Sequence, residues 1–129
     1  MAKRPESNLT NVQLEIMNLF WEQGELGVAQ VWKLLTARRP IARNTVQTML
    51  TRLADKGWLR ARAEGNAFYY RSTRPRKFAV TGMLGDLLDT AFAGSATGLV
   101  TALLEDRRIS PEDARRIREL IDRAQQEPQ

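Results

Sequence analysis

The chain has 129 residues, 43% of them hydrophobic and 27% charged, and a formal net charge of +5 at pH 7. These values suit one soluble globular unit, or one small domain with an appendage. Cysteine and histidine are both absent, which excludes disulfides, Cys/His zinc sites and catalysis by a nucleophile that needs a histidine base. We therefore expect a protein that is not an enzyme and that has no cofactor and no metal bound through cysteine or histidine.

Positive charge is concentrated in the first part of the chain. Residues 1–75 hold 12 Lys/Arg against 6 Asp/Glu, a balance of +6, whereas residues 76–129 hold 8 against 9, a balance of −1. This imbalance favours a polyanionic partner for the first part, although an unevenly charged soluble surface explains it equally well. No apolar run reaches the roughly 20 residues that span a bilayer. No apolar segment follows the basic residues within 1–8 either, so we expect no signal peptide and a cytoplasmic location.

The first predicted helix begins after residue 10 and ends at Gly24. Thr10 is a suitable N-cap, and Gln13, three residues later, completes a capping box. Leu9 and Leu14 occupy the two positions of a hydrophobic staple. Glycine is the residue at which helices most often stop, so the sequence predicts a well-delimited helix here.

Two further helices follow at short intervals. The second is predicted over 28–39, before Pro40, and the third over 43–56, before Gly57. The third helix carries an apolar stripe at positions i, i+3, i+4 and i+7, which are Val46, Met49, Leu50 and Leu53. This stripe predicts that one face of the third helix is buried.

The opposite face of the third helix is polar and almost uncharged. Asn and Gln side chains can pair with adenine in the DNA major groove, and a Thr methyl group can pack on the methyl group of thymine. In a helix-turn-helix the residues near the start of the recognition helix make these contacts. The candidates for base reading are Arg43, Asn44, Thr45, Gln47 and Thr48. The same composition is also common on a solvent-facing helix.

The segment after the third helix is predicted to be a β-hairpin, because "WLRARAE" and "AFYYRST" flank a Gly-Asn turn. Alternate residues of a strand share a face, so arginines of both strands can face DNA phosphates together. The candidates for phosphate binding, including those that flank the third helix, are Arg38, Arg39, Thr51, Arg52, Arg60, Arg62, Tyr69 and Arg71. The alternative is that these arginines are merely solvated. The aromatic residues expected in the core are Trp21, Trp32 and Trp58, together with Phe68 and Tyr70, or Tyr69, in the wing.

The rest of the chain is predicted to form three more helices, the last of them capped by Ser110 with Pro111 at its first position. About 50 residues enclose little core by themselves, so their apolar side chains need outside cover. A second copy of the segment would provide it, and packing back onto the first domain is the alternative. The residues expected at the dimer interface are Leu84, Leu87, Leu88, Phe92, Leu99, Leu103, Ile117, Leu120 and Ile121.

The order of these elements predicts a mainly α protein with two domains. Residues 1–75 would form a winged helix-turn-helix of three helices and a β-hairpin wing, and residues 76–129 a helical dimerisation domain. A winged helix that binds another protein and leaves its DNA surface idle is the competing function.

The sequence also resembles a known family. "LTNVQLEIMNLFWEQGELGVAQVWKLL" and "NTVQTMLTRLADKGWLRARAEGNAFYYR" are similar to the BlaI/MecI/CopY penicillinase-repressor family, over about residues 9–74. The resemblance implies a homodimeric transcriptional repressor in which each winged helix reads half of a pseudo-palindromic operator, with the third helix in the major groove. It also implies a partner in some members, a membrane sensor-protease that cleaves the C-terminal region.

Three departures from the family pattern bear on regulation. Copper sensing through cysteines is excluded because the chain has none. The family's Asn-Phe cleavage point corresponds to Ala102-Leu103, which puts induction by that cleavage in doubt. The Ser-Pro pair that often opens the recognition helix is replaced by Ala42 and Arg43, so we expect a different operator preference.

Overall fold

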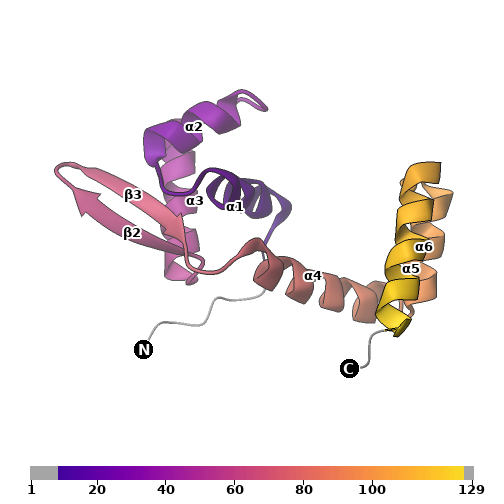
Figure 1. Cartoon of the computed structure of the whole chain (residues 1–129). Coiled ribbons are helices and arrows are strands. Elements are labelled where there is room, and N and C mark those ends of the chain that lie inside the picture. Colours follow the sequence, from indigo (N-terminus) through magenta and orange to yellow (C-terminus); the bar gives the residue numbers. More distant parts are fainter. Residues whose placement is uncertain (1–8, 127–129) are drawn as a thin grey trace. The chain divides into compact units, whose positions relative to one another are not determined.

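A computed structural model describes residues 9–126 of the chain (Figure 1). Residues 1–8, on which the expectation about a signal peptide rests, lie outside this range. The elements in order are α1 (Asn11–Gln23), β1 (Leu26–Gly27), α2 (Val28–Thr36), α3 (Arg43–Asp55), β2 (Leu59–Glu64), β3 (Ala67–Ser72), α4 (Arg76–Ala91), α5 (Ala96–Glu105) and α6 (Pro111–Gln126). The predicted helix–helix–helix–hairpin order followed by three helices is confirmed. Helix α2 is three residues shorter than expected, since 37–39 form a turn before Pro40.

The start of α1 has the predicted capping geometry. The Gln13 backbone N–H donates to Thr10 Oγ1 at 3.1 Å, and the Thr10 N–H donates to Gln13 Oε1 at 2.9 Å. At the other end, Gly24 has φ +83°, a left-handed conformation that glycine adopts without strain. Both ends of α1 are therefore specified by local sequence.

One hydrophobic core joins the first three helices to the sheet. Its largest fully buried side chains are Trp58, Phe20, Ile16, Met17, Leu35, Leu50, Leu53, Val31 and Val46. Burial of each such side chain stabilises the fold by about 1.5–3 kcal/mol relative to exposure. The predicted stripe of α3 lies in this core, with Met49 partly buried.

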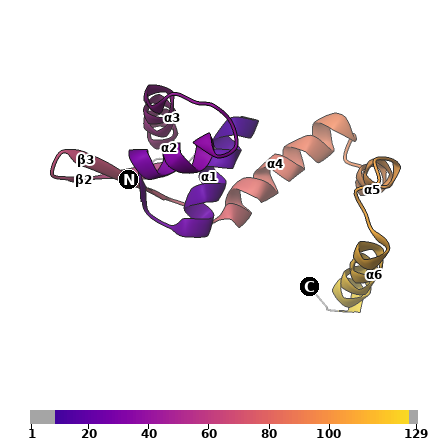
Figure 2. The same cartoon turned by 90° about the horizontal axis from the view of Figure 1, so that it is seen from above.

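The sheet has three antiparallel strands in the order β1-β3-β2. Strand β1 has only two residues and was not predicted from the sequence. It pairs Leu26 with Tyr70 and Gly27 with Tyr69, so β3 is the central strand. The hairpin of β2 and β3 extends beyond the three helices, with its turn at the free end (Figures 1 and 2). Gly65 in that turn has φ +61°, which favours glycine.

Two of the aromatic predictions were wrong. Trp32 is 36% exposed and uses its indole N–H to donate to the Ile41 carbonyl at 2.8 Å, so it ties α2 to the segment before α3. Phe68 is 52% exposed because it lies on the outer part of β3, farther along the hairpin than Tyr70, which reaches the core. Trp58 is buried as predicted, and Trp21 is partly buried against the core.

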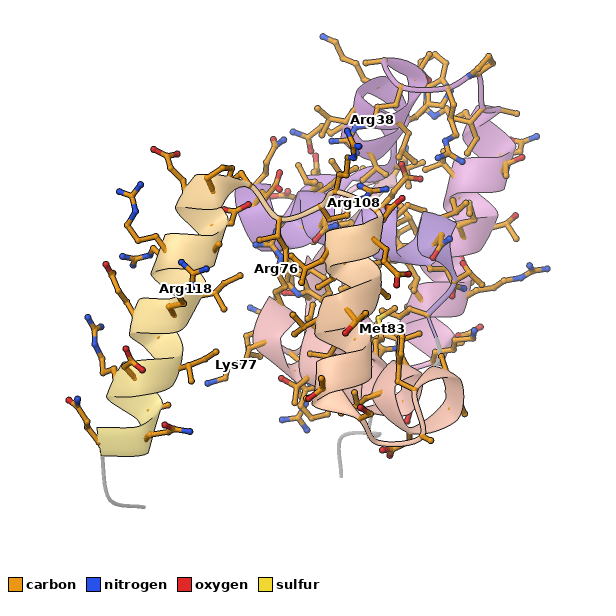
Figure 3. All side chains as sticks on the ribbon, turned by 90° about the vertical axis from the view of Figure 1, so that its right-hand side faces the viewer. Arg38, Arg76, Lys77, Met83, Arg108 and Arg118 are labelled. Carbon is orange, nitrogen blue, oxygen red and sulfur yellow. The ribbon has the colours of Figure 1, made fainter. Side chains whose placement is uncertain are left out.

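The chain divides into two compact units, and the division falls between Leu84 and Gly85, inside α4. The first part of α4 packs on the first unit, where Ala79 is buried and the Phe78 ring meets Trp58 edge-on at 6.1 Å between centroids. Arg76, in the first turn of α4 (Figure 3), donates from Nε to Asn18 Oδ1 of α1 at 3.1 Å. Trp21 Nε1 donates to the Arg74 carbonyl at 2.9 Å. The start of α4 is thus anchored on α1. The domain division at residue 76 stays a prediction.

The second unit consists of the end of α4 with α5 and α6. Ser110 caps α6 as predicted, because its Oγ accepts from the Asp113 N–H at 3.0 Å. Neither α5 nor α6 buries a single side chain. The predicted interface residues are accordingly exposed (Leu84, Leu87, Leu103, Leu120, Ile121) or half-buried (Leu88, Phe92, Leu99, Ile117).

Within residues 9–126 no single helix is long and apolar enough to cross a bilayer; α4 and α5 reach that length only as a bent pair.

Candidate nucleic-acid interface

The exposed face of α3 carries all the residues predicted to read bases. Arg43, Asn44, Thr45, Gln47 and Thr48 are exposed, whereas Val46, Leu50 and Leu53 on the other side are buried. A shallow hollow of about 480 Å³ runs along this face, lined by Asn44, Gln47, Thr48, Thr51 and Arg52. The structure therefore brings the amides, the threonines and Arg52 together on one open surface, where a large ligand can approach.

The two central threonines of this face have already used their hydroxyl hydrogens. Thr48 Oγ1 donates to the Asn44 carbonyl at 3.0 Å, and Thr51 Oγ1 donates to the Gln47 carbonyl at 3.0 Å. Each side chain can then offer only its methyl group and the remaining oxygen lone pair to a ligand. Hydrogen-bond donation from this face must come from the amides of Asn44 and Gln47 and from the arginines.

A second groove, of about 260 Å³, separates α3 from the outer part of the hairpin. Arg43 and Gln47 of α3 line one side, and residues 66–69 of the wing line the other, with 27–30 at the start of α2 below. Seven of the ten lining residues were not predicted from the sequence, and Gln30, Asn66 and Phe68 are the ones among them with polar or aromatic side chains. Asn66 could have been found, because its place in the predicted turn puts it at the free end of the wing.

The outer face of the wing carries the predicted arginines. Arg60 pairs with Arg71 and Arg62 pairs with Tyr69 in the β2–β3 register, so all four share one face. Arg60 and Arg71 line a groove of about 550 Å³ together with Arg74, which was not predicted. Within residues 9–126, neither Arg60 nor Arg71 forms an ion pair. Like charges directly opposite each other destabilise a sheet, and a polyanion would neutralise them.

Arg62 differs from its neighbours because it is engaged within the protein. Its Nη2 donates to Glu25 Oε1 at 2.7 Å and its Nε to Glu25 Oε2 at 3.2 Å. Its Nη1 lies 3.4 Å from Glu64 Oε2, and its guanidinium is 5.1 Å from the centroid of the Tyr69 ring. The hydrogen bond from Arg62 lowers the pKa of Glu25, and the charge of Arg71 adds to the shift. The same hydrogen bond raises the pKa of Arg62.

Arg38 and Arg39, expected to flank the base-reading helix, are directed to α1 instead. Arg39 Nη2 is 2.5 Å from Glu15 Oε2, and Arg38 Nη1 is 3.9 Å from Glu15 Oε1. Arg38 lies just after α2 (Figure 3). The other candidates on α3, Thr51 and Arg52, lie in the hollow along the helix.

The sequence profile of the family described as penicillinase repressor matches residues 9–123. The chain belongs to this family. The penicillinase repressor of Bacillus licheniformis is 25% identical over 122 residues, which cover 95% of this chain and 94% of the relative. The transcriptional regulator BlaI of Mycobacterium tuberculosis is 29% identical over 117 residues, which cover 89% of this chain and 83% of the relative.

One solved structure supports the fold of this penicillinase-repressor member. The DNA-binding domain of the repressor BlaI, determined in solution, matches with a TM-score of 0.51 and 32% sequence identity, over 59% of this chain and 90% of that chain. The winged-helix fold and the family predicted from the sequence are confirmed. The family is one of transcriptional repressors, a class that is not enzymatic.

Proposed function

We propose that this chain is a sequence-specific transcriptional repressor that binds a pseudo-palindromic operator as a homodimer. Helix α3 lies in the major groove and the β2–β3 wing lies along the phosphate backbone. The observation that carries this proposal is the exposed polar face of α3, flanked by arginines that form no ion pair within residues 9–126, on a scaffold that buries the opposite face of the same helix. A major groove accepts a helix that presents such a face.

Base reading falls to the first two turns of α3. Asn44 and Gln47 have the donor–acceptor pair that matches the major-groove edge of adenine, and Arg43 has the fork that matches guanine. Thr45 and Thr48 offer methyl groups to thymine. For Thr48 the methyl contact is favoured because its hydroxyl hydrogen is donated to the Asn44 carbonyl.

Phosphate binding is assigned to those candidate arginines that have no carboxylate partner in the described chain, namely Arg52, Arg60 and Arg71, and to Arg74, which lines the same groove as Arg60 and Arg71. Thr51 can serve as a donor only after it releases the Gln47 carbonyl. Arg38 and Arg39 join the phosphate contacts only after they leave Glu15. These contacts give affinity and orientation without reading sequence.

The dimer is proposed to form through residues 76–129, which constitute the second domain of this proposal. The exposed apolar side chains of α4, α5 and α6 are the surface that a second copy would bury, and they include Leu87, Leu120 and Ile121.

A repressor acts where the chromosome is, so we place the protein in the cytoplasm. Ala102 and Leu103 lie inside α5. Proteases prefer exposed loop tips, so inactivation by cleavage there requires α5 to unfold locally first.

The test begins by recovering the operator from genomic fragments that the purified chain retains at low salt. Fluorescence anisotropy then compares Thr48→Ala with Thr48→Val on operator and on a scrambled duplex. Thr48→Val keeps a methyl group and removes the hydroxyl, so it should keep most of the base preference. Thr48→Ala should relax that preference by roughly 1 kcal/mol, the lower end for a good base contact. Equal losses on both duplexes for Thr48→Ala would remove Thr48 from base reading, and retention of no fragment would refute the proposed function itself.

A further inference from the structure

Three residues from neighbouring strands form one row across the outer face of the sheet. Gly27 of β1 pairs with Tyr69 of β3, and Tyr69 pairs with Arg62 of β2. The sheet order β1-β3-β2 places the tyrosine in the middle of this row. The row links the wing to the segment that leads into α2.

Glu25, the residue just before β1, lies at the end of this row and binds Arg62. Arg62 reaches over the Tyr69 ring, 5.1 Å from its centroid, and forms two hydrogen bonds to the Glu25 carboxylate. A bidentate arginine–carboxylate pair is geometrically specific as well as strong. A third N–H group of the same guanidinium faces Glu64. Three of the five N–H directions of Arg62 are therefore taken by protein carboxylates.

Gly27 makes room for this arrangement. A Cβ at position 27 would lie 3.2 Å from Tyr69 Cε1 and 3.3 Å from Cδ1, closer than side chains usually approach. Because the backbone of Gly27 is ordinary extended chain, with φ −89°, glycine is not needed there for its conformation. Its small size lets the tyrosine ring lie against β1.

We infer that Glu25, Arg62 and Tyr69 form a strap that positions the wing relative to the helix-turn-helix, and that Arg62 is a positioning residue and not a phosphate ligand. The inference rests on the proposed DNA-binding function. Arg60 and Arg71 on the same face have no such partner in the described chain. Arg60 and Arg71 remain the phosphate ligands of the wing. The strap fixes the orientation of the wing and therefore the phosphates that these two arginines contact. Glu25 was not predicted from the sequence to be a site residue. Its hydrogen bonds to Arg62 distinguish that arginine from Arg60 and Arg71.

The experiment compares Arg62→Ala with Arg60→Ala, which serves as the matched control on the same strand. Binding to operator DNA is measured over a range of salt concentrations. Arg60→Ala should lower the salt slope by about 0.9 per protomer, the value for one lost phosphate contact. Arg62→Ala should leave the slope unchanged and weaken operator binding by roughly 1.4- to five-fold per protomer, the range for a lost surface ion pair. An equal fall of the slope in both variants would overturn the inference.

A charge swap adds a rescue that a phosphate ligand cannot show. Arg62→Glu alone should weaken operator binding, and Glu25→Arg combined with Arg62→Glu should restore part of it, because the pair is re-formed with its charges exchanged while the carboxylate at position 62 faces Glu64. A swapped protein that binds as weakly as Arg62→Glu would contradict the strap.

A readout without DNA separates this inference from the proposed function. Amide hydrogen exchange at Leu26 and Tyr70, which are partners in the β1–β3 register, reports opening of this strand pairing. Exchange there should be faster in Glu25→Gln and in Gly27→Ala than in the wild type, and unchanged in Arg60→Ala. If the wild type retains no DNA but exchange responds in this way, the strap stands and the DNA-binding function fails. Unchanged exchange in Glu25→Gln would refute the strap regardless of DNA binding.

Discussion

Arg71→Ala should weaken DNA binding and at the same time leave the fold as stable as before, or more so. Arg71 stands directly opposite Arg60 in the β2–β3 register, and within residues 9–126 neither forms an ion pair. Each protomer then loses one phosphate contact, so the salt slope of a dimer should fall by about 1.8, twice the roughly 0.9 expected for one contact. Raising salt from roughly 50 to roughly 200 mM should therefore weaken the wild type about 12-fold more than the variant.

The free energy of unfolding of Arg71→Ala should stay the same or increase, although its DNA binding is weaker. Removal of one of two like charges that face each other across a sheet relieves about 0.2–1 kcal/mol of repulsion. Anisotropy titrations on operator and scrambled duplexes at several salt concentrations measure the slope, and denaturant unfolding measures the free energy. Arg115→Ala on α6 removes the same charge outside the wing and is the control for net charge. The reasoning is refuted if Arg71→Ala and Arg115→Ala change the slope equally, or if Arg71→Ala destabilises the fold by more than about 1 kcal/mol.

Four other changes test separate parts of the structure. Thr10→Ala removes the acceptor for the Gln13 N–H and should cost about 1 kcal/mol in unfolding free energy, with no change in salt slope. Trp21→Phe keeps a ring but loses the N–H that holds the Arg74 carbonyl; amide exchange in the first turn of α4 should rise, and an unchanged rate would argue against the anchor. Leu120→Glu places a charge on the exposed apolar side of α6 and should turn a dimer into a monomer in sedimentation equilibrium, whereas the exposed Arg115→Ala should not. Because Arg62 lowers the pKa of Glu25, with Arg71 adding to the effect, the strap stabilises the fold above the ordinary glutamate pKa and is lost as pH falls through the lowered value. Glu25→Gln should therefore show a flatter acid limb of unfolding than the wild type, and identical acid limbs would contradict this.

Features set by residues close together in the sequence could be predicted. The capping box of Thr10 and Gln13 spans one helical turn, and the apolar stripe of α3 follows from helical spacing. The shared face of Arg60 and Arg71 follows from strand alternation once the Gly-Asn turn sets the register. The family pattern added the winged-helix assignment to these local signals.

Features that depend on distant partners could not be predicted. Arg62 and Glu25 are 37 residues apart, and Arg39 and Glu15 are 24 apart, so no local pattern reveals either pair. Strand β1 has two residues, too few to show alternation, and it exists because β3 pairs with it. The size of Trp32 predicts a position in the core, but its indole N–H donates to the Ile41 carbonyl at the surface.

The inward hydrogen bond of Thr48 has a consequence for the chemistry of the operator. A helix that recognises thymine by its methyl group detects a carbon substituent at C5 of a pyrimidine, and 5-methylcytosine carries the same substituent at the same position. Uracil, which pairs as thymine does, lacks it. Operators synthesised with uracil in place of single thymines should lose affinity at the positions that Thr45 or Thr48 contact. Methylation of a cytosine at such a position should recover part of the affinity lost on replacing thymine by cytosine. The repressor would then be sensitive to the methylation state of the chromosome.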